Sequence, residues 1–490
     1  MINKIQKLFF LIFVLVINFT VLKGQQSNTM YYMHRLPQSN WLNPAFQDEC
    51  KLFIGLPVLS SIYLNISNTF LSYNQFVKKS MDPDLLLKKL HRIDYISTEL
   101  HLNLLSIGYN YDKFYFTFNI AEKNNIDIGF PKDIIGLAWN GNDYFLQKNK
   151  KARLDRLGVN FIHYREFALG ASMIKDEYLT IGVKGKLLFG KLNLNTKKSD
   201  LFLLTDDNTM YLTIQSDAIL NASLPIIVNP NLTDFSYDDS QSIKGLILNR
   251  KNWGVAFDLG AIYKYDDYFT YYASIIDLGF IRWRSNLNNV TQDGKFTFRG
   301  IEGEDAINDI NNYFTEIADT FLTEFQYDPA IKKAYFYWMP TQLYLGSTYS
   351  LNRKINFGAL TKIKVFQKRI LPSFTLSANT NIFRFLSTSV SYSILNNIYN
   401  NVGLGLGFRG KIAQFYIVSD NVTGMIWPLS TRSLNIRFGF NLFFGCDHKE
   451  KCPRKPGCIW IKEMEQKLEL REERKKQNEK EKKKFIFFKK

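Results

Sequence analysis

Four cysteines are the residues whose type and spacing most clearly allow chemistry in this chain. They are Cys50, Cys446, Cys452 and Cys458. An even number of thiols in an exported chain can pair into disulfides. A metal site is the rival interpretation, but the Cys-x5-Cys-x5-Cys spacing of the last three matches no common zinc motif. We therefore expect disulfides, with free or metal-bound thiols as the alternative.

Other catalytic signals are sparse. The sequence has no phosphate-binding loop, nucleophile elbow, dinucleotide fingerprint or metal-ligand cluster. Its five histidines are scattered, at His34, His91, His101, His163 and His448. His163 lies in a strand pattern with serines nearby, but a catalytic triad needs spatial convergence, so a lumen-facing or girdle position is expected for it. We predict a non-enzymatic protein with no catalytic, cofactor-binding or metal-binding residues and no cofactor.

The segment from 434 to 444 indicates which kind of secondary structure the chain forms. Its apolar positions alternate with Asn435, Arg437, Gly439 and Asn441, and Phe443 is the exception. A period of two places the two sets on opposite faces of a strand. A soluble sheet can alternate in the same way. An aromatic face opposite an arginine and two asparagines nevertheless favours a strand between lipid and a wet lumen, the last strand of an outer-membrane β-barrel.

Targeting and composition agree with a barrel. Residues 1–24 resemble a secretory signal peptide: Lys4 and Lys7 precede an apolar core from Leu8 to Val21, with a membrane anchor helix as the alternative. No later segment has 18 uninterrupted apolar residues. Aromatic residues make up 15% of the chain and charged residues 22%, as expected for a barrel with aromatic girdles. A large soluble β-protein is the alternative.

Strand patterns fill residues 51–445, with short and long connections that recur along the chain. We predict an all-β transmembrane antiparallel barrel of about 14 strands, with a range of 12 to 16, and short helices in its loops. Helical patterns occur at 82–91, 131–150 and 304–326. Pro57 predicts an irregularity in the first strand, because proline cannot donate a ladder hydrogen bond.

The two ends of the barrel should meet. In a closed barrel with an even number of strands, the first and last strands pair antiparallel. Cys50 precedes the first strand pattern and Cys446 follows the last, so we predict a Cys50–Cys446 disulfide at the seam and a Cys452–Cys458 disulfide beyond it. Residues 25–50 are expected to form a periplasmic lead-in at the mouth of the barrel.

Residues 446–490 form a basic periplasmic tail that is either helical or disordered. Of the net charge of +17, a large part lies here, since residues 447–490 hold 16 Lys and Arg against 9 Asp and Glu. The central body is only mildly basic, which argues against a nucleic-acid partner.

Several segments resemble a Bacteroidota family of unknown function whose members are taken to be outer-membrane barrels. They are Leu36–Phe46, Ile54–Pro57, Phe415–Asn421 and Asn435–Asn441. The resemblance covers most of residues 30–445 but not the tail. Asn43, Pro44 and Ala45 are also similar to PorP/SprF proteins of type IX secretion and gliding.

The last strand also resembles the signal that the barrel assembly machinery reads. Arg437, Gly439, Leu442 and Phe444 occupy its places, although 46 residues follow. The expected partners are therefore this machinery and outer-membrane lipid, and the expected location is the cell outer membrane.

Two functions fit this barrel. The first is a structural or accessory barrel whose tail, residues 447–490, contacts a periplasmic or cell-wall partner. The second is a FadL-like transport barrel for a small or apolar solute. An outer-membrane lipid hydrolase is a weaker alternative.

Overall fold

The computed structural model describes residues 28–446 except 71, 73–82, 148–150, 210, 229–234, 239, 299–331, 353, 367–368, 384, 396–397 and 428–430. The expected signal peptide, the basic tail with Cys452 and Cys458, and the helical pattern at 304–326 lie outside the described residues. No helix among the described residues is long and apolar enough to cross a membrane.

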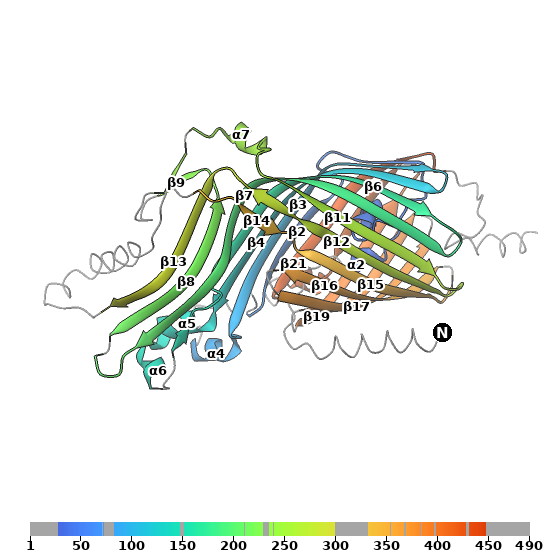
Figure 1. Ribbon diagram of the computed structural model, residues 1–490. Helices are drawn as coiled ribbons and strands as arrows, with labels where there is room; N and C mark the ends of the chain where they lie inside the picture. Colours follow the sequence, from blue (N-terminus) through green and yellow to red (C-terminus); the bar gives the residue numbers. More distant parts are fainter. Residues whose placement is uncertain are drawn as a thin grey trace, which may run out of the picture.

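The described strands form a closed antiparallel barrel of 14 strands, as predicted (Figure 1). Two short strands share the first position and two share the eighth. In ring order the strands are β1 (Leu52–Gly55) with β2 (Ile62–Asn68), β3 (Ile93–Tyr111), β4 (Phe114–Pro131), β6 (Gly158–Ile174), β7 (Leu179–Thr205), β11 (Trp253–Lys264), β12 (Phe269–Trp283), β14 (Tyr335–Trp338) with β15 (Thr341–Ser350), β16 (Ile355–Phe366), β17 (Arg369–Phe383), β18 (Leu386–Leu395), β19 (Ile398–Arg409), β20 (Ala413–Ser419) and β21 (Ser433–Phe444).

The last strand closes the ring onto the first. Leu52 of β1 pairs with Phe444 of β21, and Ser67 of β2 pairs with Ser433. The polar residues of β21 point inward, since Asn435 and Asn441 are almost fully buried, while the alternate apolar residues face outward. The predicted irregularity at Pro57 is confirmed: the first strand is interrupted between β1 and β2, and Val58 there has a φ of 64°.

The two ends of the barrel differ. Short turns and the Cys50–Cys446 disulfide lie at one end, here called the turn end. The other end, the loop end, carries longer connections with the helices α4 (Pro83–Lys89), α5 (Lys132–Asn140), α6 (Asp143–Leu146), α7 (Ile243–Ile247) and α10 (Val422–Ile426). Helices thus occur in the described parts of two predicted helical segments, 82–91 and 131–150. The pair β9 (Ile226–Val228) and β10 (Phe235–Tyr237) forms a separate small sheet.

At the loop end the sheet extends past the ring as a wing. The second half of β7 pairs with β8 (Leu212–Ser223), and β8 pairs with β13 (Leu287–Phe298). The short β5 (Ala152–Arg153) joins β7 on its other side. In Figure 1 the wing lies on the left, with α4, α5 and α6 below it.

The segment before the first strand lies inside the barrel, and the prediction of a lead-in at its mouth is wrong for residues 28–46. These residues, here called the plug, include α2 (Asn28–Tyr31) and the 3-10 helix Pro37–Trp41. Figure 1 shows α2 within the ring of strands. The reason is apolar burial, because the plug and the inner wall form one core cluster: Met30, Tyr31, Tyr32, Met33, Leu36, Leu42 and Phe46 pack with Tyr272, Ile276, Tyr344, Leu360, Tyr416 and Val418.

Candidate functional site in the barrel lumen

Hydrogen bonds fix the plug to strands far away in the sequence. The backbone N–H of Thr29 donates to Oδ1 of Asp420 at 2.7 Å. The Tyr32 hydroxyl donates to the Ala359 carbonyl at 2.6 Å, and the Ser274 hydroxyl donates to the Leu42 carbonyl at 2.6 Å. Because buried polar groups are costly when unpaired, these bonds select one docked position for the plug.

Glycines on the inner wall make room for the plug. A Cβ at Gly182 would lie 2.3 Å from the carbonyl carbon of Pro44, and a Cβ at Gly358 would lie 2.5 Å from Cε2 of Tyr32. The same close approach occurs at four other lumen-facing glycines: Gly260, Gly346, Gly403 and Gly405. Any side chain at these positions would overlap the plug, so the wall is shaped to hold it.

A polar chamber lies beyond the plug, in the middle of the lumen. Met30, Trp41 and Leu42 of the plug form part of its lining, and the rest comes from the barrel wall. The chamber has a volume of about 120 Å³, which is room for several waters. Ten charged side chains line this lumen chamber: Lys123, Lys184, Lys186, Lys362, Lys364 and Arg437 against Glu99, Glu166, Asp258 and Asp277.

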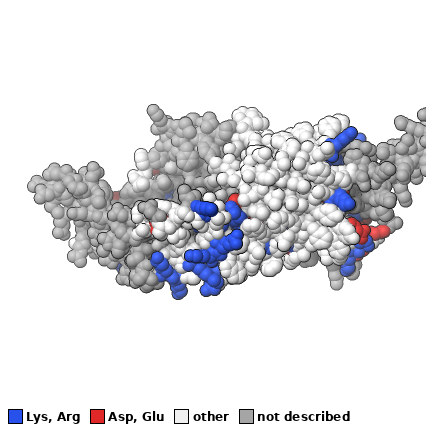
Figure 2. All heavy atoms as spheres, turned by 90° about the horizontal axis from the view of Figure 1, so that it is seen from above, with Lys and Arg blue, Asp and Glu red and all other residues white. Residues whose placement is uncertain are grey.

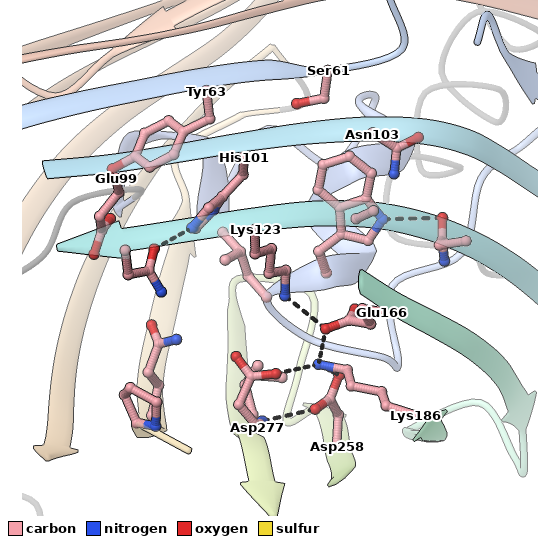
Figure 3. Close-up of a pocket in the computed structure, with 18 of the residues that line it drawn as sticks. Ser61, Tyr63, Glu99, His101, Asn103, Lys123, Glu166, Lys186, Asp258 and Asp277 are labelled. Carbon is pink, nitrogen blue, oxygen red and sulfur yellow. Dashed lines mark hydrogen bonds and ion pairs between the residues drawn. The ribbon is translucent and has the colours of Figure 1, made fainter. Parts of the chain in front are cut away.

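One side of the lumen chamber is a tightly paired network (Figure 3). Nζ of Lys186 lies 2.6 Å from Oδ1 of Asp277 and 2.7 Å from Oδ2 of Asp258. Lys123 binds Glu166 at 2.8 Å. Burial of these charges is tolerable only because each has a partner of opposite sign.

A β-bulge brings the two aspartates together. The register of β11 and β12 shifts between Phe257 and Leu259, where β12 holds an extra residue. Asp277 adopts a φ of 59° there, and its N–H donates to Asp258 at 2.8 Å. Bulges re-aim side chains, and positive φ at a non-glycine residue needs support from its surroundings. The strand geometry is therefore adapted to this charge cluster.

The opposite side of the chamber holds an excess of cations. Nζ of Lys364 lies 3.9 Å from the Glu99 carboxylate, which is a loose ion pair. Lys362 lies over the Tyr344 ring at 5.3 Å, and Arg437 lies over the Tyr63 ring at 4.3 Å. Aromatic faces stabilise cations, and the lining on this side holds three cations and one carboxylate.

An aromatic layer separates the chamber from the loop end. Trp283 is fully buried and stacks with Tyr335 at a centroid distance of 6.4 Å. It packs against Gly190 and belongs to a cluster with Tyr164, Tyr337 and Phe366. The lumen is thus layered, with apolar packing below and above a charged middle.

The predicted disulfide joins the first and last strands at the turn end. Cys50 and Cys446 are joined across 396 residues of sequence. Beside them Arg409 pairs with Asp48 at 3.3 Å and lies over the Phe443 ring at 4.0 Å. Burial raises the pKa of the Asp48 carboxyl, and the Arg409 guanidinium opposes that rise. The plug therefore ends at a fixed covalent anchor.

The four residues of the predicted insertion signal all lie on β21 but do not form one site. Arg437 lines the chamber, and Gly439 faces inward, where a Cβ would meet the Ser60 carbonyl at 2.0 Å. Leu442 and Phe444 lie on the outward face. Whether the assembly machinery reads them stays a prediction.

Sequence reasoning singled out His163 and missed the chamber. His163 lies on the outer wall, where its Nε2 contacts Glu122 at 3.0 Å. The signal for the chamber was present as single charges inside apolar strand patterns, such as Lys186, Asp258 and Asp277. Within the described residues, no three His, Cys, Asp or Glu side chains are grouped as a metal site would require.

Comparison with known proteins identifies the family. The model of DUF5723, a family of unknown function, matches residues 44–420. The chain belongs to this family. The match confirms the predicted resemblance to a family of unknown function, whereas the link to Bacteroidota and the similarity to PorP/SprF stay predictions. No curated protein matches the chain.

Among solved structures, a Pseudomonas aeruginosa FadL homologue matches with 12% identity and a TM-score of 0.37, over 87% of this chain and all of that chain. The P. putida toluene transporter TodX matches with 10% identity and a TM-score of 0.36, over 82% and 92% of the two chains. The translocator domain of the autotransporter NalP from Neisseria meningitidis matches with 8% identity and a TM-score of 0.30, over 85% and 97%.

Proposed function

We propose that this DUF5723 protein is a non-enzymatic outer-membrane barrel that admits a small anionic solute to its lumen, with the plug controlling passage. The observation that carries the proposal is the lumen chamber. A charged space with room for several waters is held between the plug and the Trp283 layer, and its lining has more cations than carboxylates. A barrel that served only as a scaffold would have no need of such a lining.

The outer wall supports a position in a membrane. Figure 2 shows an almost uncharged wall with Lys and Arg at its two ends. Trp253 and Tyr263 are exposed aromatic residues near the two ends of β11. At roughly 3.3 Å per residue and a tilt of about 40°, they lie about 25 Å apart along the membrane normal, the height of a transmembrane barrel's apolar band. The turn end then faces the periplasm.

The chamber favours an anion for an electrostatic reason. Lys186 and Lys123 pair with Asp277, Asp258 and Glu166, and the whole lining holds six cations against four carboxylates. In a lumen of low dielectric constant, an excess positive charge attracts an anion more strongly than in bulk water. The tyrosine rings beside these cations would contact the apolar part of such a solute.

Passage requires movement of the plug. The chamber has room for only a few waters, and the packed core of residues 28–46 lies between it and the turn end. Residues 28–46 belong to no strand of the barrel and join the wall at Cys50, so displacement from the lumen would not need the barrel strands to separate.

Ion conductance in planar bilayers tests this proposal. The wild-type barrel should conduct weakly, and deletion of residues 25–46 combined with Trp283→Ala, which opens the aromatic layer on the other side of the chamber, should raise conductance at least ten-fold, with anions preferred. Lys362→Gln combined with Lys364→Gln in this opened barrel should abolish the preference. Lys113→Gln, at an exposed position on the turn end, is the matched control and should leave it unchanged. A folded barrel that carries the deletion and Trp283→Ala but stays silent would refute the proposal.

A second candidate function is an accessory barrel that contacts an envelope partner through residues 447–490. The disulfide favours it, since Cys446 fixes the root of that segment at the turn end. Deletion of residues 447–490 should leave the barrel folded and remove a co-purifying periplasmic or cell-wall partner. An unchanged set of co-purifying proteins would contradict this role.

A further inference from the structure

A group of cations lies on the outside of the barrel at the loop end, away from the chamber; three of them are exposed and Arg282 is half-buried. Arg250 and Lys251 precede β11, Arg282 lies at the end of β12, and Arg284 follows it. These four residues are here called the outer cationic cluster. Figure 2 shows Lys and Arg side chains gathered where the uncharged barrel wall meets the wing.

Asn252 holds the two segments of the cluster together. Its Oδ1 accepts hydrogen bonds from the backbone N–H of Arg284 at 2.8 Å and of Ser285 at 2.9 Å. Asn252 is fully buried, and its own carbonyl accepts from Gly190 of β7 at 2.7 Å. The backbone carrying these cations is therefore pinned to the barrel wall, unlike a free surface loop.

Aromatic side chains orient the two arginines. Trp253, Arg282 and Phe336 are register partners on three adjacent strands. The Arg282 guanidinium lies 5.5 Å from the Phe336 ring centre, and Arg284 lies 5.8 Å from the Trp253 ring centre. A guanidinium that lies against a ring keeps its N–H edges free for acceptors, and its fork matches phosphate oxygens.

The cluster has no carboxylate partner among the described residues. None of the ion pairs among the described residues includes Arg250, Lys251, Arg282 or Arg284. Nε of Arg282 is buried and has no hydrogen-bond acceptor, so this atom is not itself a contact for an external anion. The carboxylate of Glu122 on the same outer wall is already bound by His163 and Arg165. Arg250 and Lys251 are adjacent in the chain, and Arg282 and Arg284 lie at the end of the neighbouring strand β12, so their combined charge would attract an anion from outside the chain.

The height of the cluster indicates which anion. Trp253, Phe336 and Trp338 are exposed and form the aromatic girdle of the loop end, so the cluster lies where the apolar band meets headgroups. From this placement we infer that the outer cationic cluster binds the phosphate groups of a phosphorylated glycolipid, such as lipid A, in the outer leaflet. The inference rests on the proposed membrane orientation but not on solute passage.

Binding of lipid A to the full-length barrel in phosphatidylcholine nanodiscs tests the inference. Native mass spectrometry would count bound lipid for phosphorylated lipid A, for dephosphorylated lipid A and for phosphatidylglycerol. The wild type should prefer phosphorylated lipid A, and Arg282→Gln combined with Arg284→Gln should lower that binding about ten-fold. Lys113→Gln combined with Lys175→Gln, two exposed cations of the turn end, is the matched control and should bind as the wild type does.

Three outcomes would overturn the inference. Equal binding of phosphorylated and dephosphorylated lipid A would exclude the phosphates as the recognised group. Preference for phosphatidylglycerol would exclude a glycolipid of the outer leaflet. Undiminished binding by the double variant would exclude the cluster. If the double variant does not show the gel mobility of a folded barrel, Arg284→Gln alone replaces it, because Arg284 is exposed and lies outside the strands. Conductance is measured separately, so failure here leaves the proposed function untouched.

Discussion

Gly182 on β7 offers a direct test of how the plug is held. A Cβ there would lie 2.3 Å from the carbonyl carbon of Pro44, 2.4 Å from its oxygen and 2.5 Å from the Ala45 nitrogen. All three are backbone atoms, so no side-chain rotation relieves the overlap. Gly182→Ala should therefore shift the plug by about 1 Å or displace it, since relaxed carbon contacts lie near 3.5–4.0 Å.

The cost follows from the overpacking of a close-packed interior. Such substitutions destabilise by typically about 1–3 kcal/mol, which lowers the ratio of docked to undocked plug by roughly 5- to 150-fold. The barrel itself should keep its stability, because alanine weakens a strand no more than glycine does.

Trypsin cleavage after Arg35 measures the undocked fraction, since Arg35 is the sole Lys or Arg between Asn28 and Cys50. Gly182→Ala should speed this cleavage by the same 5- to 150-fold factor. Gly185→Ala, three residues along the same strand, is the control, because a Cβ there would meet nothing within 4 Å. Equal cleavage rates in the two folded variants would refute the idea that the wall glycines hold the plug.

Three other predictions concern stability and assembly. Lys186→Met should destabilise the barrel by about 3–5 kcal/mol because it leaves the buried carboxylates of Asp258 and Asp277 unpaired. A lower temperature of the heat-induced gel shift would show this loss. Adding Asp258→Asn and Asp277→Asn should restore most of the lost stability. Cys446→Ser should cost about 2–5 kcal/mol in the same assay, and an unchanged transition would mean that the disulfide adds no stability. Phe444→Ala should lower the yield of inserted barrel, whereas Phe408→Ala, equally exposed on β19, should not.

The barrel was predictable because its signals are local. The alternation in β21 needs only neighbouring residues, and the break at Pro57 follows from one missing N–H. The disulfide required one further step, that a closed ring brings the first and last strands together. With Cys50 and Cys446 flanking those strands, the pairing follows from topology.

The plug and the chamber were not predictable in the same way. Residues 28–46 have no period of two or of 3.6, so Met30 and Tyr31 gave no sign of an element that is buried on all sides. Their partners lie hundreds of residues away, as the bond from Asn28 to Thr375 across 347 residues shows. The chamber depends on a bulge that places Asp277 beside Asp258, and bulges leave no pattern in a single sequence.

The Cys50–Cys446 bond makes the barrel a covalent ring, and the plug enters the lumen from this ring. A protease that cuts a connection at the loop end would cut within this ring. A single cut there would open the ring without dividing the molecule, and the barrel would migrate as one chain until a reductant is added. A single proteolytic cut between Cys50 and Cys446 would therefore leave the two fragments joined by the disulfide.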